Sequence, residues 1–178
     1  MGTLTEQAES APESGVARAQ REAQRIAIDV KPKPSAEHPR GQELVRIWSE
    51  ARESGQPMTR GDVPSRKLLK LMPHLFLLEP NADGTDWRFR LAGTAIGRRF
   101  GADPTGALIS QIYERRQAVE QAEIYKGVVC GSTPHITQGR IEGIDRQFLK
   151  IEFCHLPLLP PGQGLNWLLG GVFVFEQA

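Results

Sequence analysis

The segment from Leu71 to Gly101 constrains the fold more than any other part of the chain. An apolar run ends at Glu79–Pro80, a turn cluster occupies residues 81–85, and an alternating run follows from Trp87 to Leu91. The glycine-bounded stretch 93–101 comes next. Alternation indicates a half-buried strand, and clustered Asn, Asp and Gly indicate a tight turn. The segment therefore predicts a strand, a hairpin turn, a second strand and a short helix.

The region before this segment divides into a tail and a helix. Residues 1–40 contain no aromatic residue and include the run Lys31-Pro32-Lys33-Pro34, so we expect a disordered tail there and an ordered domain over residues 41–178. From Gln42 to Glu53, apolar side chains recur at helical spacing and share one face. The members of that face that we expect to pack on the sheet or in a dimer are Leu44, Ile47 and Trp48.

The second half of the chain is predicted to be helical and then β. Residues 107–129 have helical character that is interrupted near residue 115, which favours two helices over one rod. Three strands are then expected at 135–141, 147–153 and 167–175. The pair Gly170–Gly171 inside the last strand indicates a bulge or a close approach of backbone. The fold class that follows is α+β, with one antiparallel sheet.

Composition excludes several classes of protein. A net charge of +1 and the lack of a long basic run argue against nucleic acid as a partner. No apolar stretch reaches about 18 residues, so neither a membrane span nor a secretory signal is expected. The two cysteines, Cys130 and Cys154, are too few for a disulfide framework and favour a reducing cytoplasm.

Three phrases of the sequence together resemble a known family. They are MPHLFLLE, WRFRLAGTAIGRRFG and the step GSTP, and the match extends over residues 42–176. They resemble a bacterial subfamily of stand-alone PAS domains, PAS type 5. The resemblance implies a PAS-like five-stranded antiparallel sheet with helices on one face and an N-terminal cap helix. It also implies a cup between the sheet and the helices that encloses a small molecule.

The resemblance implies a non-enzymatic sensory or regulatory module, which signals through a separate output protein or a change of homodimer. Two alternatives stay open: a ligand-free interaction or dimerisation module, and a small α+β enzyme. An enzyme would need a carboxylate–histidine pair, for which the candidates are Glu79, Glu152, His74 and His155. Strand alternation places Glu152 opposite Ile151, and we expect it outside the core.

The cofactor stays unknown at this point. In haem-binding PAS domains the helix before the third strand carries a histidine, and residues 116–130 contain none. Photosensory relatives carry a flavin-reactive cysteine in the short helix that corresponds to residues 93–100, which contains none. The four histidines lack metal-ligand spacing. Nine residues are expected to line the cup, with His74 or Arg140 as polar anchors: His74, Phe76, Phe89, Tyr113, Tyr125, Ile136, Arg140, Phe153 and Phe173.

Overall fold

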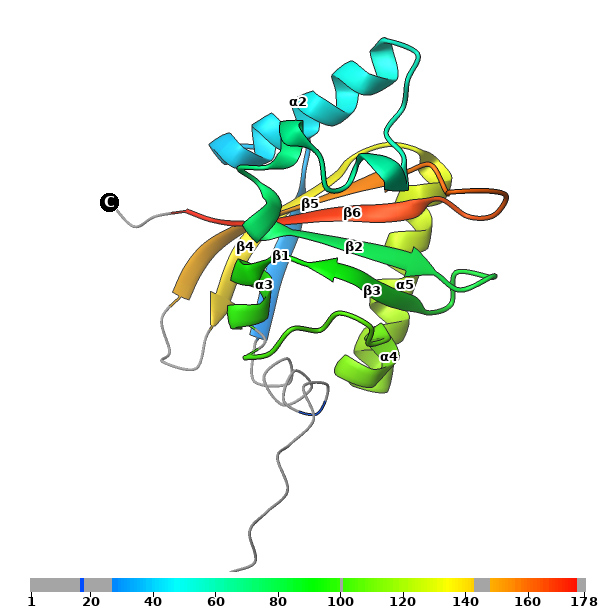
Figure 1. Ribbon diagram of the computed structural model, residues 1–178. Coiled ribbons are helices and arrows are strands. Elements are labelled where there is room, and N and C mark those ends of the chain that lie inside the picture. The colour runs from blue at the N-terminus through cyan, green and yellow to red at the C-terminus, as the bar shows by residue number, and fades with distance from the viewer. Residues whose placement is uncertain (1–16, 18–26, 100, 143–147, 176–178) are drawn as a thin grey trace, which may run out of the picture.

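The computed structural model describes residues 17, 27–99, 101–142 and 148–175, which build one antiparallel sheet between two layers of helices (Figure 1). The strands follow the order β1-β4-β5-β6-β2-β3. Every pair of neighbouring strands is antiparallel, as the sequence predicts. The strand bounds are β1 (Ala27–Lys33), β2 (Leu75–Pro80), β3 (Trp87–Ala92), β4 (His135–Glu142), β5 (Phe148–Leu158) and β6 (Trp167–Val174).

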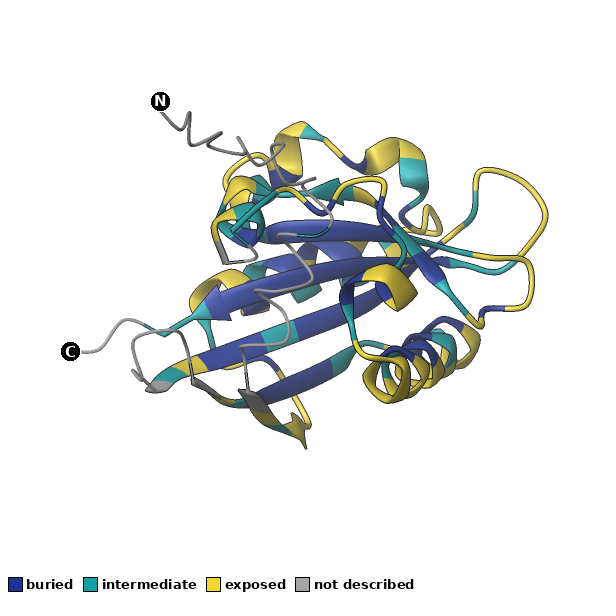
Figure 2. Cartoon of the chain, turned by 90° about the horizontal axis from the view of Figure 1, so that it is seen from below, coloured by how far each residue is buried: buried dark blue, intermediate teal, exposed yellow. Residues whose placement is uncertain are grey.

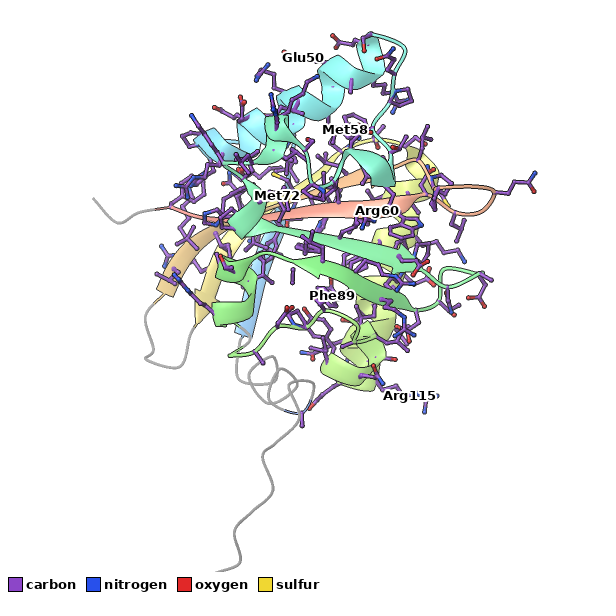
Figure 3. All side chains as sticks on the ribbon, in the orientation of Figure 1. Glu50, Met58, Arg60, Met72, Phe89 and Arg115 are labelled. Carbon is purple, nitrogen blue, oxygen red and sulfur yellow. The ribbon has the colours of Figure 1, made fainter. Side chains whose placement is uncertain are left out.

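The two faces of the sheet are covered by different helices. On one face lie α2 (Pro39–Glu53) and the 3-10 turns η1 (Arg60–Asp62), η2 (Arg66–Leu68) and η3 (Met72–His74). On the other lie α4 (Ile109–Ile112) and α5 (Arg115–Gly131), while the short α3 (Thr94–Arg99) adds Ile96 to the core of that side. In Figure 3 Met58 lies beneath α2 and Phe89 lies on β3, one in each of the two cores. The strands between the helices are buried along most of their length (Figure 2).

The predicted hairpin forms β2 and β3, and it contains an irregularity that the sequence conceals. The register shifts between Leu77 and Leu78, which pair with Leu91 and Phe89, so that Arg90 is an extra residue in β3. An extra residue reverses the alternation of a strand beyond it. Phe89 consequently faces α5, whereas Leu91 packs on the α2 side. The expectation that Trp87, Phe89 and Leu91 share one face is therefore wrong for Leu91.

Helix α2 begins three residues earlier than the predicted helix and lies on the sheet as the sequence indicates. His38 caps it by accepting a hydrogen bond from the Arg40 backbone N–H, and a proline stands in its first turn. Leu44, Ile47 and Trp48 are buried against the sheet, and Trp48 Nε1 donates to Pro157 O at 2.7 Å. The apolar face is thus used within the chain.

The helical stretch after β3 breaks in two, close to the predicted position. Helix α4 ends at Ile112, the next two residues are extended, and α5 then runs to Gly131. Ser132, with a left-handed φ of 53°, ends α5 directly after Gly131. Because the chain breaks between α4 and α5, α5 can cross the strands. Its buried face then lies over β5 and β6.

Strand β1 differs from the predicted tail. Residues 27–33 pair with residues 136–142 of β4 and add a sixth strand at the edge of the sheet, while most of residues 1–26 lie outside the described part. The close approach of β1 to β4 depends on Gly139, which lies opposite Val30. A Cβ at Gly139 would lie 1.8 Å from Asp29 O and 2.7 Å from Val30 Cα. Backbone atoms cannot yield to such a contact, so β1 needs glycine at this position.

We expect Gly139→Ala to detach β1 and to leave the rest of the sheet in place. The added Cβ collides with the β1 backbone, whereas the fully buried members of both cores belong to other elements. Hydrogen exchange of the β1 amides should become at least about tenfold faster, because local opening exposes these donors. Gly162→Ala is the matched control, since no atom lies within 4 Å of that Cβ. Unchanged protection of β1 in Gly139→Ala would contradict this role of Gly139.

Candidate functional site

Buried aromatic side chains gather on the sheet face that α5 covers. We call this group the aromatic cluster: Phe76, Trp87, Phe89, Tyr125, Phe153 and His155. Five of its members come from β2, β3 and β5, and Tyr125 comes from α5. Apolar residues of α4, α5 and β6 surround the cluster. It occupies the face of the sheet where the predicted ligand cup would lie.

A glycine in β6 shapes the floor of the cluster. Gly170 pairs with His155 on one side and with Phe76 on the other. A Cβ at Gly170 would lie 1.9 Å from Phe76 Cζ, so the phenyl ring lies across β6 where that strand has no side chain. This position brings the Phe76 ring to 6.0 Å from the His155 ring. The group that approaches Gly170 is a side chain, where the sequence predicted a bulge or a close approach of backbone.

Tyr125 contacts two other members of the cluster. Its ring centroid lies 5.6 Å from Trp87 and 5.4 Å from His155, and both contacts are edge-to-face. Ala122 and Val129, one turn away on either side, bury the same face of α5 and hold Tyr125 over the sheet. Burial raises the pKa of Tyr125 well above its usual value, and it raises the pKa of Tyr113 to about 12. Both phenols are therefore neutral at physiological pH.

Two ring nitrogens of the cluster lack hydrogen bonds. Within the described residues, Trp87 Nε1 and His155 Nδ1 are the buried side-chain polar atoms without a partner. Trp87 is 0% exposed and His155 is 7% exposed. An unpaired buried polar group costs about 1–3 kcal/mol, so most proteins avoid it. The rings that carry these two atoms both contact Tyr125.

His155 is uncharged in the folded protein. Desolvation, with a smaller effect from His135 on the neighbouring strand, lowers the pKa of His155 from 6.5 to about 3. The two imidazoles are stacked with their centroids 6.2 Å apart. The interior of the cluster therefore presents neutral donors and acceptors and no formal charge.

This burial gives a pH dependence of stability. Since the unfolded chain protonates His155 near pH 6.5 and the folded chain only near pH 3, stability is full above pH 6.5 and falls as the pH drops between these values. The loss attributable to His155 approaches, at most, about 1.4 kcal/mol per pH unit. In urea titrations at falling pH, we expect the unfolding free energy of the wild type to decrease relative to that of His155→Phe, because only the wild type carries this histidine. A difference that is constant from pH 7 to pH 4 would contradict the neutral state.

Five of the nine predicted cup residues lie together on this face, namely Phe76, Phe89, Tyr113, Tyr125 and Phe153. The other four lie elsewhere. Ile136 and Phe173 face α2, because their strand parity is opposite to that of His155. His74 is on the α2 side as well, with Nε2 3.0 Å from Arg40 Nη1, and Arg140 is exposed on β4.

The two unpaired residues were not among the predicted cup residues. Trp87 was assigned only to a strand face, and His155 was considered only as a catalytic alternative. A usable signal was present, because His155 follows Phe153 at the spacing of one strand face. The spacing could not reveal that the two nitrogens lack partners, since this depends on α5 packing over the sheet.

A second buried polar group lies on the opposite face, below the start of α2. The Glu152 carboxylate is 0% exposed, although strand alternation predicted a position outside the core. It accepts hydrogen bonds from Glu37 N at 2.7 Å, His38 N at 3.2 Å and Gln138 Nε2 at 2.6 Å. The first turn of α2 covers it, and a Cβ at Gly41 would lie 2.0 Å from its Oε1 atom. Glu152 therefore fixes the N-terminal end of α2 to the middle of the sheet.

The candidate catalytic residues are dispersed. Glu79 pairs with Arg90, Glu152 and His155 lie on opposite faces of β5, and His74 lies beside Arg40. Cys130 is exposed and Cys154 is buried on the α2 side, and both are free thiols. In the part of the chain that the structure describes, no three His, Cys, Asp or Glu residues gather in a group able to hold a metal ion.

The comparison with protein families agrees with this architecture. The model of the PAS domain family matches residues 36–173. The chain belongs to the PAS domain family. The PAS match contains strands β2 to β6 and the helices on both faces, whereas β1 lies before it. No curated protein and no solved structure matches the chain.

The family places this PAS domain in a class of sensory and regulatory modules, with the α+β fold that the sequence predicts. The sheet has six strands because β1 adds one to the expected five. Helices α4 and α5 cover one face, and α2, the expected N-terminal cap helix, lies on the other. Among the helices that the structure describes, none is both long and apolar enough to cross a bilayer.

Proposed function

We propose that this PAS domain is a non-enzymatic sensor that binds a small molecule against the aromatic cluster and signals through α2. The observation that carries the proposal is the pair of unpaired buried nitrogens, Trp87 Nε1 and His155 Nδ1, which flank the same tyrosine. Apolar walls with a few polar groups are the usual composition of a ligand site. A molecule that supplied hydrogen bonds to both atoms would remove the cost of leaving them unpaired.

The route of the signal is strand β5. His155 faces the cluster, and Glu152, separated from it by Phe153 and Cys154, faces α2. A ligand that displaces His155 shifts the same strand that anchors the start of α2. The shift favours a second arrangement of α2 only to the extent that the ligand binds that arrangement more tightly.

The output passes to a separate protein or to a second copy of the chain, since α2 presents a charged outer face. Glu43, Arg46 and Glu50 form an ion-paired row on that face. Leu44, Ile47 and Trp48 stay in the core and would contact a partner only if α2 moved. The free cysteines fit a reducing cytoplasm as the setting.

Mass spectrometry of the protein as purified from cells tests the proposal. We expect the native protein to carry an extra mass that denaturation releases, and we expect Trp87→Phe to reduce its occupancy. Trp167→Phe is the matched control, because Trp167 lies in the core on the α2 side. If neither bound mass nor thermal stabilisation by any of a panel of metabolites is found, the ligand-free interaction module becomes the better account.

A further inference from the structure

We propose that the start of α2 is a proton-sensitive latch, which is closed while His38 and His74 are neutral and released when they take up protons. The latch acts on the helix that the proposed function uses for output, but it is independent of any ligand at the aromatic cluster. It follows from the directions of the hydrogen bonds that surround the first turn of α2.

His38 holds the first turn of α2 with both nitrogens of its ring. Its Nδ1 atom accepts a hydrogen bond from the Arg40 backbone N–H at 3.1 Å, and its Nε2 atom lies 3.2 Å from Val174 O. A carbonyl oxygen can only accept, so Nε2 carries the proton and Nδ1 carries a lone pair. The ring also stacks on Phe173 and meets Phe175 edge to face. A second proton, on Nδ1, would set two N–H groups against each other and abolish the helix cap.

His74 accepts a hydrogen bond from the same arginine. Its Nε2 atom lies 3.0 Å from Nη1 of Arg40, and a guanidinium can only donate. Nε2 of His74 therefore carries a lone pair and Nδ1 carries the proton, which is the opposite tautomer to that of His38. Protonation of His74 would turn this hydrogen bond into a contact between two cations. Arg40 thus joins the two histidines, and each N–H group that it donates needs a neutral ring.

The charged groups beside His38 are already engaged with one another. Glu37 is ion-paired with Lys33 of β1 and Lys150 of β5, and the hydrogen bond from Lys33 lowers the pKa of Glu37. Glu152 of β5 accepts hydrogen bonds from the backbone N–H groups of Glu37 and His38 and from a side-chain amide. Strand β6 adds aromatic rings and a carbonyl oxygen. A proton on His38 would therefore gain little from these anions and would lose the hydrogen bond to α2.

The groups around His74 also disfavour added positive charge. Arg40 contacts His74, and α3, which packs on η3, carries a further cation, Arg98. Glu43, one turn along α2, is paired with Arg46, which holds the pKa of Glu43 below its usual value. A free imidazole takes up a proton near pH 6.5. A fall in pH from about 7.5 to about 5.5 therefore favours the open arrangement, whose rings can accept protons.

Nuclear magnetic resonance of the full chain tests the latch. At pH 7.5 the 15N shifts of the rings should show the Nε2–H tautomer for His38 and the Nδ1–H tautomer for His74. The amides of His38, Arg40 and Gln42 donate hydrogen bonds in the closed arrangement. We expect their protection from hydrogen exchange, corrected for the intrinsic rate, to fall at least about tenfold between pH 7.5 and pH 5.5. Protection near Glu53 should change less than about twofold.

A double variant, His38→Asn with His74→Gln, removes both titrating rings and keeps an acceptor at each position. Asparagine is a good N-cap residue, and the glutamine carbonyl can accept from Arg40. The first turn of α2 in this variant should keep at pH 5.5 the protection that it has at pH 7.5. The matched control is His135→Gln, which removes an imidazole from β4 and should leave the response of α2 to pH as in the wild type.

Three results would overturn the latch: the opposite ring tautomers, wild-type protection that does not fall between the two pH values, and a fall in the double variant as large as in the wild type. None of them bears on the binding of a small molecule at the aromatic cluster, so the latch and the sensor function fail separately. The measurements on the wild-type chain need no variant and stay decisive should the double variant fold poorly.

Discussion

Replacement of Gly170 by alanine is expected to lower the free energy of unfolding by about 3 kcal/mol. The new Cβ would lie 1.9 Å from Phe76 Cζ and within 2.3 Å of two further atoms of the same ring. Phe76 is 5% exposed and is held between Phe89 and His155, so the ring cannot move away without disturbing both. Chemical denaturation of the purified domain measures the loss.

A second substitution distinguishes overpacking from a loss of glycine flexibility. Gly170 has no positive φ, so its backbone conformation suits any residue. Phe76→Leu removes part of the ring that the new methyl group meets, and it should restore more than half of the stability lost in Gly170→Ala. The control Gly162→Ala should change the unfolding free energy by less than about 0.5 kcal/mol. A double variant that is merely additive would contradict direct contact between the two positions.

Replacement of Glu152 by alanine is expected to cost about 3 kcal/mol and to loosen the first turn of α2. The change leaves the backbone N–H groups of Glu37 and His38 and the amide of Gln138 without their acceptor. Hydrogen exchange should accelerate for amides at the start of α2 more than for those near Glu53. Denaturation and hydrogen exchange on the same sample provide the two measurements.

Two further variants test this role of Glu152. Gly41→Ala should reproduce the loosening of α2, because its Cβ would lie 2.0 Å from Glu152 Oε1 and would displace the carboxylate. Glu50→Ala, which removes an exposed carboxylate paired with Arg46, should cost less than about 1 kcal/mol. If Glu152→Ala is as mild as Glu50→Ala, Glu152 does not anchor α2 and the proposed signal route through β5 loses its support.

Local patterns in the sequence were sufficient to predict most elements. The hairpin 74–91, the short helix from Thr94, the break before α5 and the three C-terminal strands follow from alternation, helical spacing and turn residues. The interior position of Phe89 also follows, since it alternates with Arg88 and Arg90 along its strand. The predicted helix at 94–100 includes Phe100, and the predicted strand at 147–153 includes Gln147, both of which lie outside the described residues.

The remaining features depend on contacts between distant segments. Strand β1 exists because Gly139, more than a hundred residues later, leaves space for its backbone. Ile136 and Phe173 could not be assigned to a face of the sheet from the sequence. A short alternating run does not show which of its two sets of side chains points to which face. The burial of Glu152 depends on the close packing of α2 over its carboxylate at Gly41, where a side chain would collide with it. None of these pairings leaves a periodic signal in the chain.

The most direct measurement follows the indole N–H resonances of the three tryptophans in a 15N-labelled sample. Trp48 Nε1 already donates to Pro157 O, and Trp167 lies on the α2 side, so only Trp87 reports on the aromatic cluster. When the small-molecule fraction of a cell extract is added, we expect a saturable shift of the Trp87 indole signal with little change in the other two. A Trp87 signal that no fraction moves, or a shift confined to Trp48 or Trp167, would contradict ligand binding at this cluster.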